Sequence, residues 1–257
     1  MKRISNKDIP ISNIGVVGII IRGKKPREVL LEIKDDGSPK KAWQRHINPI
    51  GGSWKPQDQN PLDTLRRELK EELSIAKGCF RPVKLHLLDQ KPQGEFYPVA
   101  TNGPPPTSED WCSLNYIKQV IAERYAPFGD YIITVSQAVL NSADPDNAHV
   151  GYSVIHSYWI AVLNEEEWNN LTALQEKFGN LSNEAVTVIT TVDEIVKTGI
   201  KTAFGHDQPL KEMFLSFGLP LAQQYPLIDG IKCRMVGPPM ISYKEYLNHY
   251  NIVRKPV

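Results

Sequence analysis

Three glutamates are the residues of this sequence best placed to do chemistry. Glu68, Glu71 and Glu72 lie directly after Arg67, at steps of three and four residues. On an α-helix this spacing places the three carboxylates on one face, where they repel one another. A divalent cation would turn the repulsion into attraction, and Mg²⁺ prefers carboxylate and phosphate oxygens as ligands. A solvated, charged helix face is the alternative explanation for the same glutamates.

The residues around these glutamates predict the helix that positions them. Leucines recur through residues 61–73 at steps of three, four and four, namely Leu62, Leu65, Leu69 and Leu73. This spacing is typical of an amphipathic helix that packs its apolar side on a core. Asn60 supplies a capping side chain, and Pro61 suits the first helical position. We expect the carboxylates on the opposite, exposed face.

This segment also resembles a known motif. Arg67-Glu68-Leu69-x-Glu71-Glu72, with Gly51-Gly52 in the preceding loop, resembles the Nudix box of the Nudix hydrolase superfamily, G-x5-E-x7-R-E-U-x-E-E-x-G-U with U aliphatic. The resemblance spans residues 52–75 and implies an α/β/α sandwich with a mixed β-sheet. It further implies that Glu68, Glu71 and Glu72 bind Mg²⁺, with Mn²⁺ as the alternative ion. It gives Arg67 a catalytic role and places Gly51 and Gly52 at the bound cofactor.

The box departs from the family pattern at three points. The spacing from Gly52 to Arg67 is one residue longer, Gln59 stands at the early glutamate position counted back from Arg67, and Ser74 replaces the late glycine. In the family that glutamate commonly pairs with the box arginine. Gln59 offers Arg67 a hydrogen bond without charge, and the neighbouring Asp58 is the alternative partner. Ser74 predicts a different turn after the helix, because serine adopts positive φ poorly.

A glutamate outside the box completes the predicted site. The resemblance implies a further catalytic or metal-binding carboxylate in the loop ahead of a late strand, and Glu184 lies there. A solvated loop carboxylate is an equal alternative. Three other acidic residues, Glu165, Glu166 and Glu167, are rivals, but their position after a strand is more typical of an acidic first helical turn.

Some basic and aromatic side chains are weaker candidates for substrate contacts. Four basic residues of a predicted hairpin loop could bind phosphates, although a solubilised sheet edge is the favoured explanation: Arg22, Lys24, Lys25 and Arg27. Three aromatic residues could stack on a base, although core or rim packing is favoured for each: Trp43, Trp54 and Phe96.

The remaining pattern predicts an α/β domain around the box. We expect strands at residues 14–21, 28–33, 83–88, 154–163 and 186–191, and helices at 111–123, from about 168, from 192 and at 210–217. Residues 131–140 fit either a strand or a helix. A single domain is predicted at 10–220, with an insertion at about 89–150 and a C-terminal extension at 221–257 packed on it.

The composition limits the kinds of partner that the protein could attract and the cellular compartment that suits it. Lysine and arginine total 30 against 29 acidic residues, so no overall field attracts nucleic acid or a membrane surface. The three cysteines are scattered, without the spacing of a disulfide or zinc framework. The N-terminus lacks the apolar run of a signal peptide, and residues 14–21 are too few to span a bilayer. We expect a soluble, cytoplasmic protein, and the resemblance adds a weaker expectation of a homodimer.

Two functions follow from the resemblance. The first is a Mg²⁺-dependent pyrophosphohydrolase, acting on the phosphoric anhydride bond of a nucleoside triphosphate or of a nucleoside diphosphate linked to another moiety, and releasing a nucleoside monophosphate. The second is a catalytically attenuated Nudix-fold protein that binds or senses a nucleotide. Gln59, Ser74 and the predicted insertion favour the second.

Overall fold

The computed structural model describes residues 10–25, 28–34, 46–75, 83–84, 95–96, 105–135, 153–182, 184–191, 202–203, 205–216 and 231–253. Several residues for which the sequence made a prediction lie outside these ranges. They are Trp43, Arg27, strand residues 85–88 and the start of a helix at 192.

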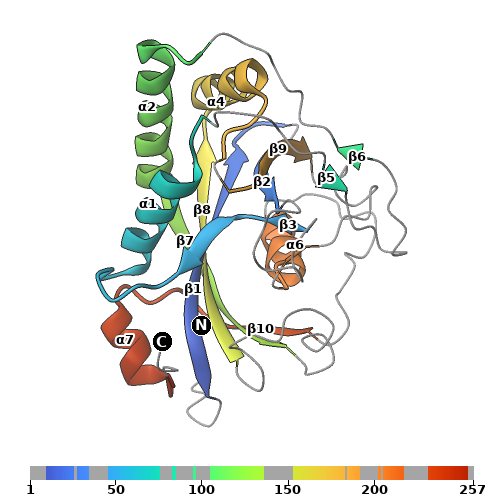
Figure 1. Ribbon diagram of the computed structural model, residues 1–257. Helices are drawn as coiled ribbons and strands as arrows, with labels where there is room; N and C mark the ends of the chain where they lie inside the picture. The colour runs from blue at the N-terminus through green and yellow to red at the C-terminus, as the bar shows by residue number, and fades with distance from the viewer. Residues whose placement is uncertain are drawn as a thin grey trace.

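A mixed eight-stranded β-sheet forms the centre of the described fold (Figure 1). Its main path runs β10-β7-β8-β1-β2-β3, with β4 paired to β1 and β9 paired to β2. β1 and β8 are parallel, and the other pairs are antiparallel. The strands are β1 (Ile11–Arg22), β2 (Glu28–Ile33), β3 (Ile47–Asn48), β4 (Ile50–Ser53), β7 (Tyr125–Val135), β8 (Ser153–Leu163), β9 (Val186–Thr191) and β10 (Ile231–Gly237). β5 (Val83–Lys84) and β6 (Glu95–Phe96) form a separate pair.

Helices cover both faces of the sheet, as Figure 1 shows. α1 (Pro61–Glu72), α2 (Ser108–Arg124), α4 (Glu165–Phe178) and α7 (Tyr243–His249) share one hydrophobic core with the sheet, and α6 (Asp207–Ser216) belongs to a second. β1 supplies both cores by alternation, because Val16 and Ile20 face the first core whereas Val17 and Ile19 face the second. The predicted α/β class with a mixed sheet is confirmed.

Most predicted elements of the described residues form where the pattern placed them. The hairpin β1–β2, the box helix α1 and the strands β8 and β9 match their predictions. The uncertain segment after residue 131 is a strand, β7, which begins earlier, at Tyr125. α4 begins at Glu165 rather than about residue 168, because Asn164 caps it and forms a capping box with Glu167.

Two segments differ from the expected organisation. Residues 108–135, which we expected within an insertion, form α2 and β7 of the main layers, with β7 lying between β10 and β8. The tail after residue 220 supplies the edge strand β10 and the helix α7, neither of which the sequence pattern predicted. The domain boundaries at 10–220 and 221–257 stay predictions. In the described part of the chain, no helix is both long and apolar enough to cross a membrane.

Candidate active site

The box helix α1 forms for the reasons its sequence gives. Asn60 Oδ1 accepts a hydrogen bond from the Asp63 backbone N–H at 3.0 Å, and Pro61 occupies the first turn. Leu65 and Leu69 lie in the core at 0% and 2% exposure. The helix ends at Glu72, and its C-cap residue Leu73 is extended (φ −77°) and forms a β-bridge with Ser182. The chain therefore leaves α1 through an extended segment, consistent with the different turn that Ser74 predicted.

Strand β4 lies directly against the carboxylate face of α1. Gly51 and Gly52 pair with Val17 and Val16 of β1, and the Gly51 backbone N–H donates to Glu72 Oε2 at 3.1 Å. A Cβ at Gly52 would overlap the Glu68 carboxylate. Gly52 therefore lets β4 approach α1 closely, whereas Gly51 is required by the backbone of β1, because a Cβ there would overlap the Val16 carbonyl oxygen.

Two of the three box carboxylates are buried, which corrects the expectation of an exposed face. Glu68 and Glu72 are 9% and 3% exposed, whereas the Glu71 side chain is 47% exposed. β4 covers the part of the helix surface that the leucine pattern had left to solvent. Burial raises the pKa of Glu68, although Arg67 partly offsets it. Burial and the nearby Glu32 raise the pKa of Glu72 well above its usual value.

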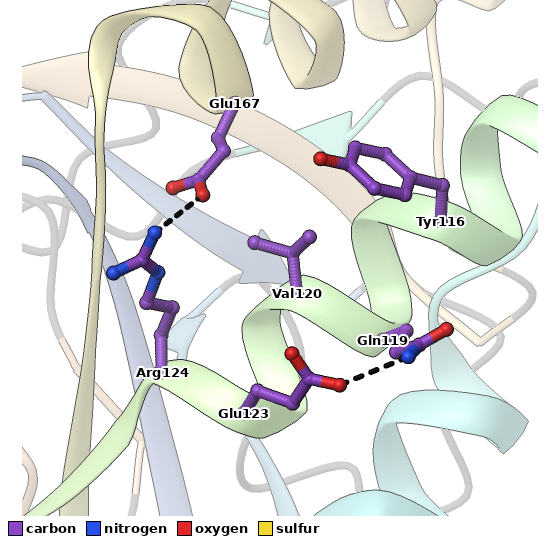
Figure 2. A pocket seen from close by; sticks show the side chains of 6 residues that line it. All are labelled: Tyr116, Gln119, Val120, Glu123, Arg124 and Glu167. Atoms are coloured by element: carbon purple, nitrogen blue, oxygen red, sulfur yellow. Dashed lines mark hydrogen bonds and ion pairs between the residues drawn. The ribbon is translucent and has the colours of Figure 1, made fainter.

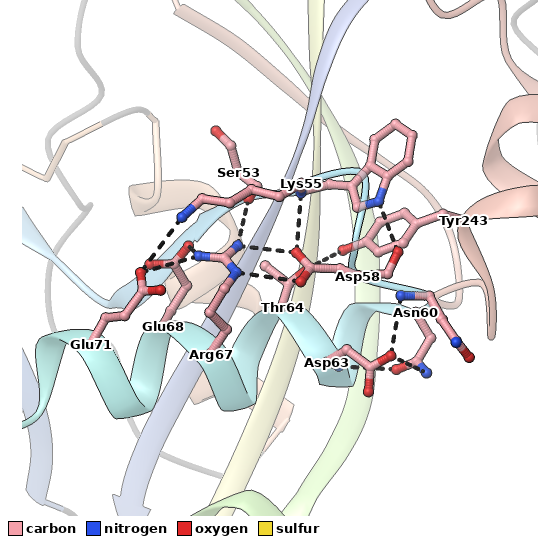
Figure 3. Close-up of polar contacts among 12 residues, drawn as sticks. Ser53, Lys55, Asp58, Asn60, Asp63, Thr64, Arg67, Glu68, Glu71 and Tyr243 are labelled. Carbon is pink, nitrogen blue, oxygen red and sulfur yellow. Dashed lines mark hydrogen bonds and ion pairs between the residues drawn. The ribbon is translucent and has the colours of Figure 1, made fainter.

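Arg67 connects these carboxylates to the loop before the helix (Figure 3). Its guanidinium forms ion pairs with Glu68 and, at 3.3 Å, with Glu71. It donates to both Asp58 oxygens, at 3.1 and 3.3 Å, and to the Ser53 carbonyl oxygen at 2.9 Å. Burial disfavours the charged Asp58 carboxylate, but the hydrogen bonds from Arg67 and other donors lower its pKa overall.

Asp58 is therefore the partner of Arg67, as the sequence alternative proposed. Asp58 follows Gly52 with five residues between them, which is the family's spacing from its glycine to its glutamate. The additional residue lies between Asp58 and Arg67. Gln59 has an exposed side chain, and its backbone N–H donates to Asp63. Counting from the glycine instead of back from the arginine identifies the partner correctly.

A buried Glu32–Lys34 pair next to Glu72 was missed by the sequence analysis. Glu32 lies in β2 at 0% exposure and accepts a hydrogen bond from Ser182 Oγ at 2.7 Å. Lys34 Nζ lies 3.1 Å from Glu32 Oε2 and 3.7 Å from Glu72 Oε1. Burial favours the neutral amine, but these carboxylates outweigh it and raise the pKa of Lys34. A single glutamate inside the apolar run of residues 29–33 was the available signal.

The carboxylate predicted outside the box, Glu184, lies near this pair. Its side chain is exposed, its backbone N–H donates to Ser182 Oγ at 3.2 Å, and its charge contributes to the raised pKa of Lys34. The catalytic role of Glu184 stays a prediction.

The rival acidic residues have structural roles at the start of α4. Glu165 forms an ion pair with Arg22, and Glu167 closes the capping box and binds Arg124 at 2.7 Å. This confirms that they form an acidic first turn. Arg22 is therefore engaged by Glu165 and, at 2.9 Å, by Glu28.

The remaining candidates contribute less to the site. Lys24 and Lys25 are exposed in the loop between β1 and β2. Trp54 stacks on Tyr243, with ring centroids 4.8 Å apart, and its Nε1 donates to the Asp58 carbonyl oxygen. Packing therefore explains Trp54. Phe96 lies in β6.

A separate pocket lies between α2 and the start of α4 (Figure 2). Its volume is about 420 Å³, and its lining residues are Tyr116, Gln119, Val120, Glu123, Arg124 and Glu167. The Arg124–Glu167 ion pair crosses one side of it. The pocket shares no residue with the box.

The donor chemistry of the box suits a hard divalent cation, but its carboxylates are engaged by the chain's own cations. Arg67 binds Glu68 and Glu71, and Lys34 lies beside Glu72. Within the described ranges, no group of three or more His, Cys, Asp or Glu side chains is arranged as a metal site. Glu68 and Glu71 would have to turn from Arg67 to bind an ion together with Glu72.

Comparison with known proteins identifies the family. A family model described as the NUDIX domain matches residues 13–150, which is more than half of the chain. The chain belongs to the Nudix domain family. The match contains most of β1 together with β2, β4, α1, α2 and β7, and so includes the whole box. No curated protein matches the sequence.

The solved structures that the chain is similar to are distant in sequence. The C-terminal domain of mouse MUTYH, solved with human PCNA, is 11% identical over 83% of this chain and 94% of that chain, with a TM-score of 0.38. The NUDIX domain of Shewanella oneidensis NrtR, solved with ADP ribose, is 10% identical over 83% and 94%, with a TM-score of 0.39. A mutT/nudix family protein from Listeria innocua is 13% identical over 81% and 95%, with a TM-score of 0.40.

Proposed function

We propose that the protein is a Nudix-type pyrophosphohydrolase that cleaves a nucleoside triphosphate, or a nucleoside diphosphate linked to another moiety, to a nucleoside monophosphate. One observation carries the proposal. The box carboxylates Glu68 and Glu72 contact the two glycines of β4, and an ion pair with Asp58 fixes Arg67 beside these carboxylates. Membership of the Nudix family supports the reaction class.

In this proposal the glutamates and the arginine of the box have different roles. Glu68, Glu71 and Glu72 would hold Mg²⁺, with Mn²⁺ as the alternative ion. The bound ion would supply charge stabilisation at phosphorus and would activate a water molecule. Arg67 neutralises Glu68 and Glu71 in the absence of an ion and would release them to it. Water adds to one phosphorus and the anhydride P–O bond breaks, so the products are a nucleoside monophosphate and either pyrophosphate or the phosphorylated second moiety. Glu184 is the proposed acceptor of the water proton.

A specific observation favours the second candidate, a binding module without turnover. Arg67 and Lys34 already supply positive charge to the box carboxylates, so the site is partly neutralised by the chain itself. Such a site could accommodate a nucleotide without assembling a complete metal centre.

A substrate panel with Mg²⁺ tests both candidates. The panel contains nucleoside triphosphates, nucleotide sugars, ADP-ribose-like compounds and dinucleotides, and product release is measured with and without EDTA. The hydrolase proposal expects EDTA-sensitive release of a nucleoside monophosphate from at least one compound. A rise in melting temperature with a nucleotide, but no product, would instead identify the binding module. Neither turnover nor binding with any compound would reject both.

A further inference from the structure

The C-terminal helix α7 lies against the loop that carries Asp58. Tyr243, in the first turn of α7, is 3% exposed, and its backbone N–H donates to the Gln59 carbonyl oxygen at 3.2 Å. Its ring stacks on Trp54 with an interplanar angle of 27°. Its hydroxyl lies 2.6 Å from Thr64 Oγ1 of α1. Tyr243 thus contacts both the loop and the box helix.

The direction of the hydrogen bonds follows from the chemistry of the groups. Thr64 Oγ1 donates its single hydrogen to Asp58 Oδ2 at 2.9 Å, because a carboxylate only accepts. The Tyr243 hydroxyl must therefore donate to Thr64. Asp58 in turn accepts from Arg67 (Figure 3). A continuous path runs from α7 to the arginine that holds Glu68.

Every member of this path between α7 and Arg67 is buried. Tyr243, Thr64 and Asp58 are 3%, 0% and 7% exposed. Water is therefore largely excluded, and each hydrogen bond fixes the next group more firmly than it would at the surface. Trp54 adds a second connection, because its ring stacks on Tyr243 while its Nε1 donates to the Asp58 carbonyl oxygen at 3.1 Å.

We propose that α7, which lies outside residues 13–150 of the family match, positions the Nudix box: Tyr243, acting through Thr64 and Asp58, holds Arg67 in the orientation that binds Glu68 and Glu71. Tyr243 is a positioning residue in this arrangement. The inference deepens the proposed function and rests on it for the role of the glutamates. The orientation of Arg67 can be measured without turnover.

The helix contains a matched control. Tyr246, one turn after Tyr243, is also buried, but its hydroxyl binds Asp130 at 2.8 Å and Ser157 at 3.1 Å, on β7 and β8. Tyr243→Phe and Tyr246→Phe therefore remove the same atom from the same helix. Only Tyr243→Phe interrupts the path to Arg67.

The experiment follows the side-chain Nε–Hε signal of Arg67 by NMR, assigned by its loss in Arg67→Lys. We expect Tyr243→Phe to shift this signal and to accelerate its hydrogen exchange by roughly threefold to tenfold, as the loss of one hydrogen bond allows. Tyr246→Phe should leave the signal in place. An unchanged signal in Tyr243→Phe, or an equal change in both variants, would overturn the proposal.

A second pair of variants decides the question if Tyr243→Phe does not fold. Thr64→Val removes the hydroxyl in the middle of the path, whereas Thr64→Ser keeps it. The proposal expects the Arg67 signal to change in the valine variant and to be retained in the serine variant. The same result in both would contradict it. If the protein hydrolyses nothing yet Tyr243→Phe moves the signal, the proposed function fails and the positioning role stands.

Discussion

Arg67 is the residue on which the candidate site depends. It is largely buried, with 15% of its side chain exposed, and it joins the loop residue Asp58 to Glu68 and Glu71. Its bidentate bonds to the Asp58 carboxylate fix the plane of the guanidinium. Substitutions of its partners should therefore separate structural support from chemistry.

Asp58→Asn should lower stability, whereas Gln59→Glu should not raise it. The first change removes the charge from a buried pair and should reduce the free energy of unfolding by about 1 to 3 kcal/mol. The second adds a carboxylate between Asp58 and Asp63, where Arg67 is already engaged. Urea unfolding of both variants checks this. A clear gain in stability in Gln59→Glu would show that Asp58 does not satisfy Arg67.

Glu71→Gln and Glu72→Gln should both lower turnover, by on the order of tenfold to thousandfold, since each removes a ligand charge. Their effects on stability should differ. Glu71 is half exposed, so its substitution should change unfolding by under about 0.5 kcal/mol. Glu72→Gln keeps an acceptor for the Gly51 N–H and relieves repulsion with Glu32, so stability should be equal or higher.

Urea unfolding without added metal and steady-state kinetics measure these two effects, with Lys70→Gln as the exposed control on the same helix. Wild-type turnover in both glutamine variants would remove these residues from the site. A strongly destabilised Glu72→Gln would show that its charge supports the fold.

The sequence predicts the residues of the box but not the residues that surround them in the fold. The motif gave the positions of Glu68, Glu71, Glu72 and Arg67, because helical spacing is a local property. The burial of Glu68 and Glu72 depends on β4, and the Glu32–Lys34 pair depends on β2 lying near α1. Such contacts join distant segments and leave no periodic signal in the chain.

At the scale of the element, the apolar side of α1 sets its orientation. Leu69 lies in the core at 2% exposure, so Leu69→Ala should leave a cavity and lower the free energy of unfolding by about 2 to 5 kcal/mol. The adjacent Lys70 is exposed, and Lys70→Ala should be nearly neutral. Thermal and urea unfolding measure both. Equal stability of the two variants would contradict the packing of α1 described here.

The pairing of α2 with α4 should depend on pH through Asp110. Lys177 binds this carboxylate at 2.6 Å and, together with hydrogen bonds from Thr107, lowers its pKa to about 2. Because the pKa is lower in the folded state, the interaction stabilises the fold above about pH 4 and is lost as the pH falls towards 2.

Asp110→Asn should therefore flatten the decline in unfolding free energy between about pH 4 and pH 2. Glu109→Gln, an exposed change in the same first turn, is the control and should keep the wild-type slope. Identical slopes in the wild type and Asp110→Asn would show that the pair does not couple to folding.

Elements with a strong local pattern were predictable, and those defined by distant pairing were not. α1 and β8 carry clear periodicity or a long apolar run, and both formed as expected. α7 has only seven residues and is held by Tyr243 and Tyr246, which bind the box loop and the sheet. The role of β7 depends on its neighbours β8 and β10, which are separated from it in the sequence.

At the scale of the molecule, the residues of the family match lack a strand from the middle of the sheet. Residues 13–150 include β7 and most of β1 but lack β8, which pairs with both and lies between them in the sheet. A fragment of residues 13–150 should therefore fail to unfold cooperatively, whereas residues 10–253 should retain a thermal transition. Circular dichroism with heating measures this. A cooperative transition in the shorter fragment would mean that β1 and β7 form a sheet without β8.

The parallel pairing of β1 with β8 also has a consequence for synthesis on the ribosome. Gly18 pairs with Trp159, so after β1 leaves the ribosome roughly 140 more residues must be added, which takes on the order of 10 s at typical elongation rates. During that interval the apolar β1 presents an edge without its final partner, the kind of segment that associates with other chains. The nascent protein should therefore depend on chaperones that shield β1 until β8 emerges.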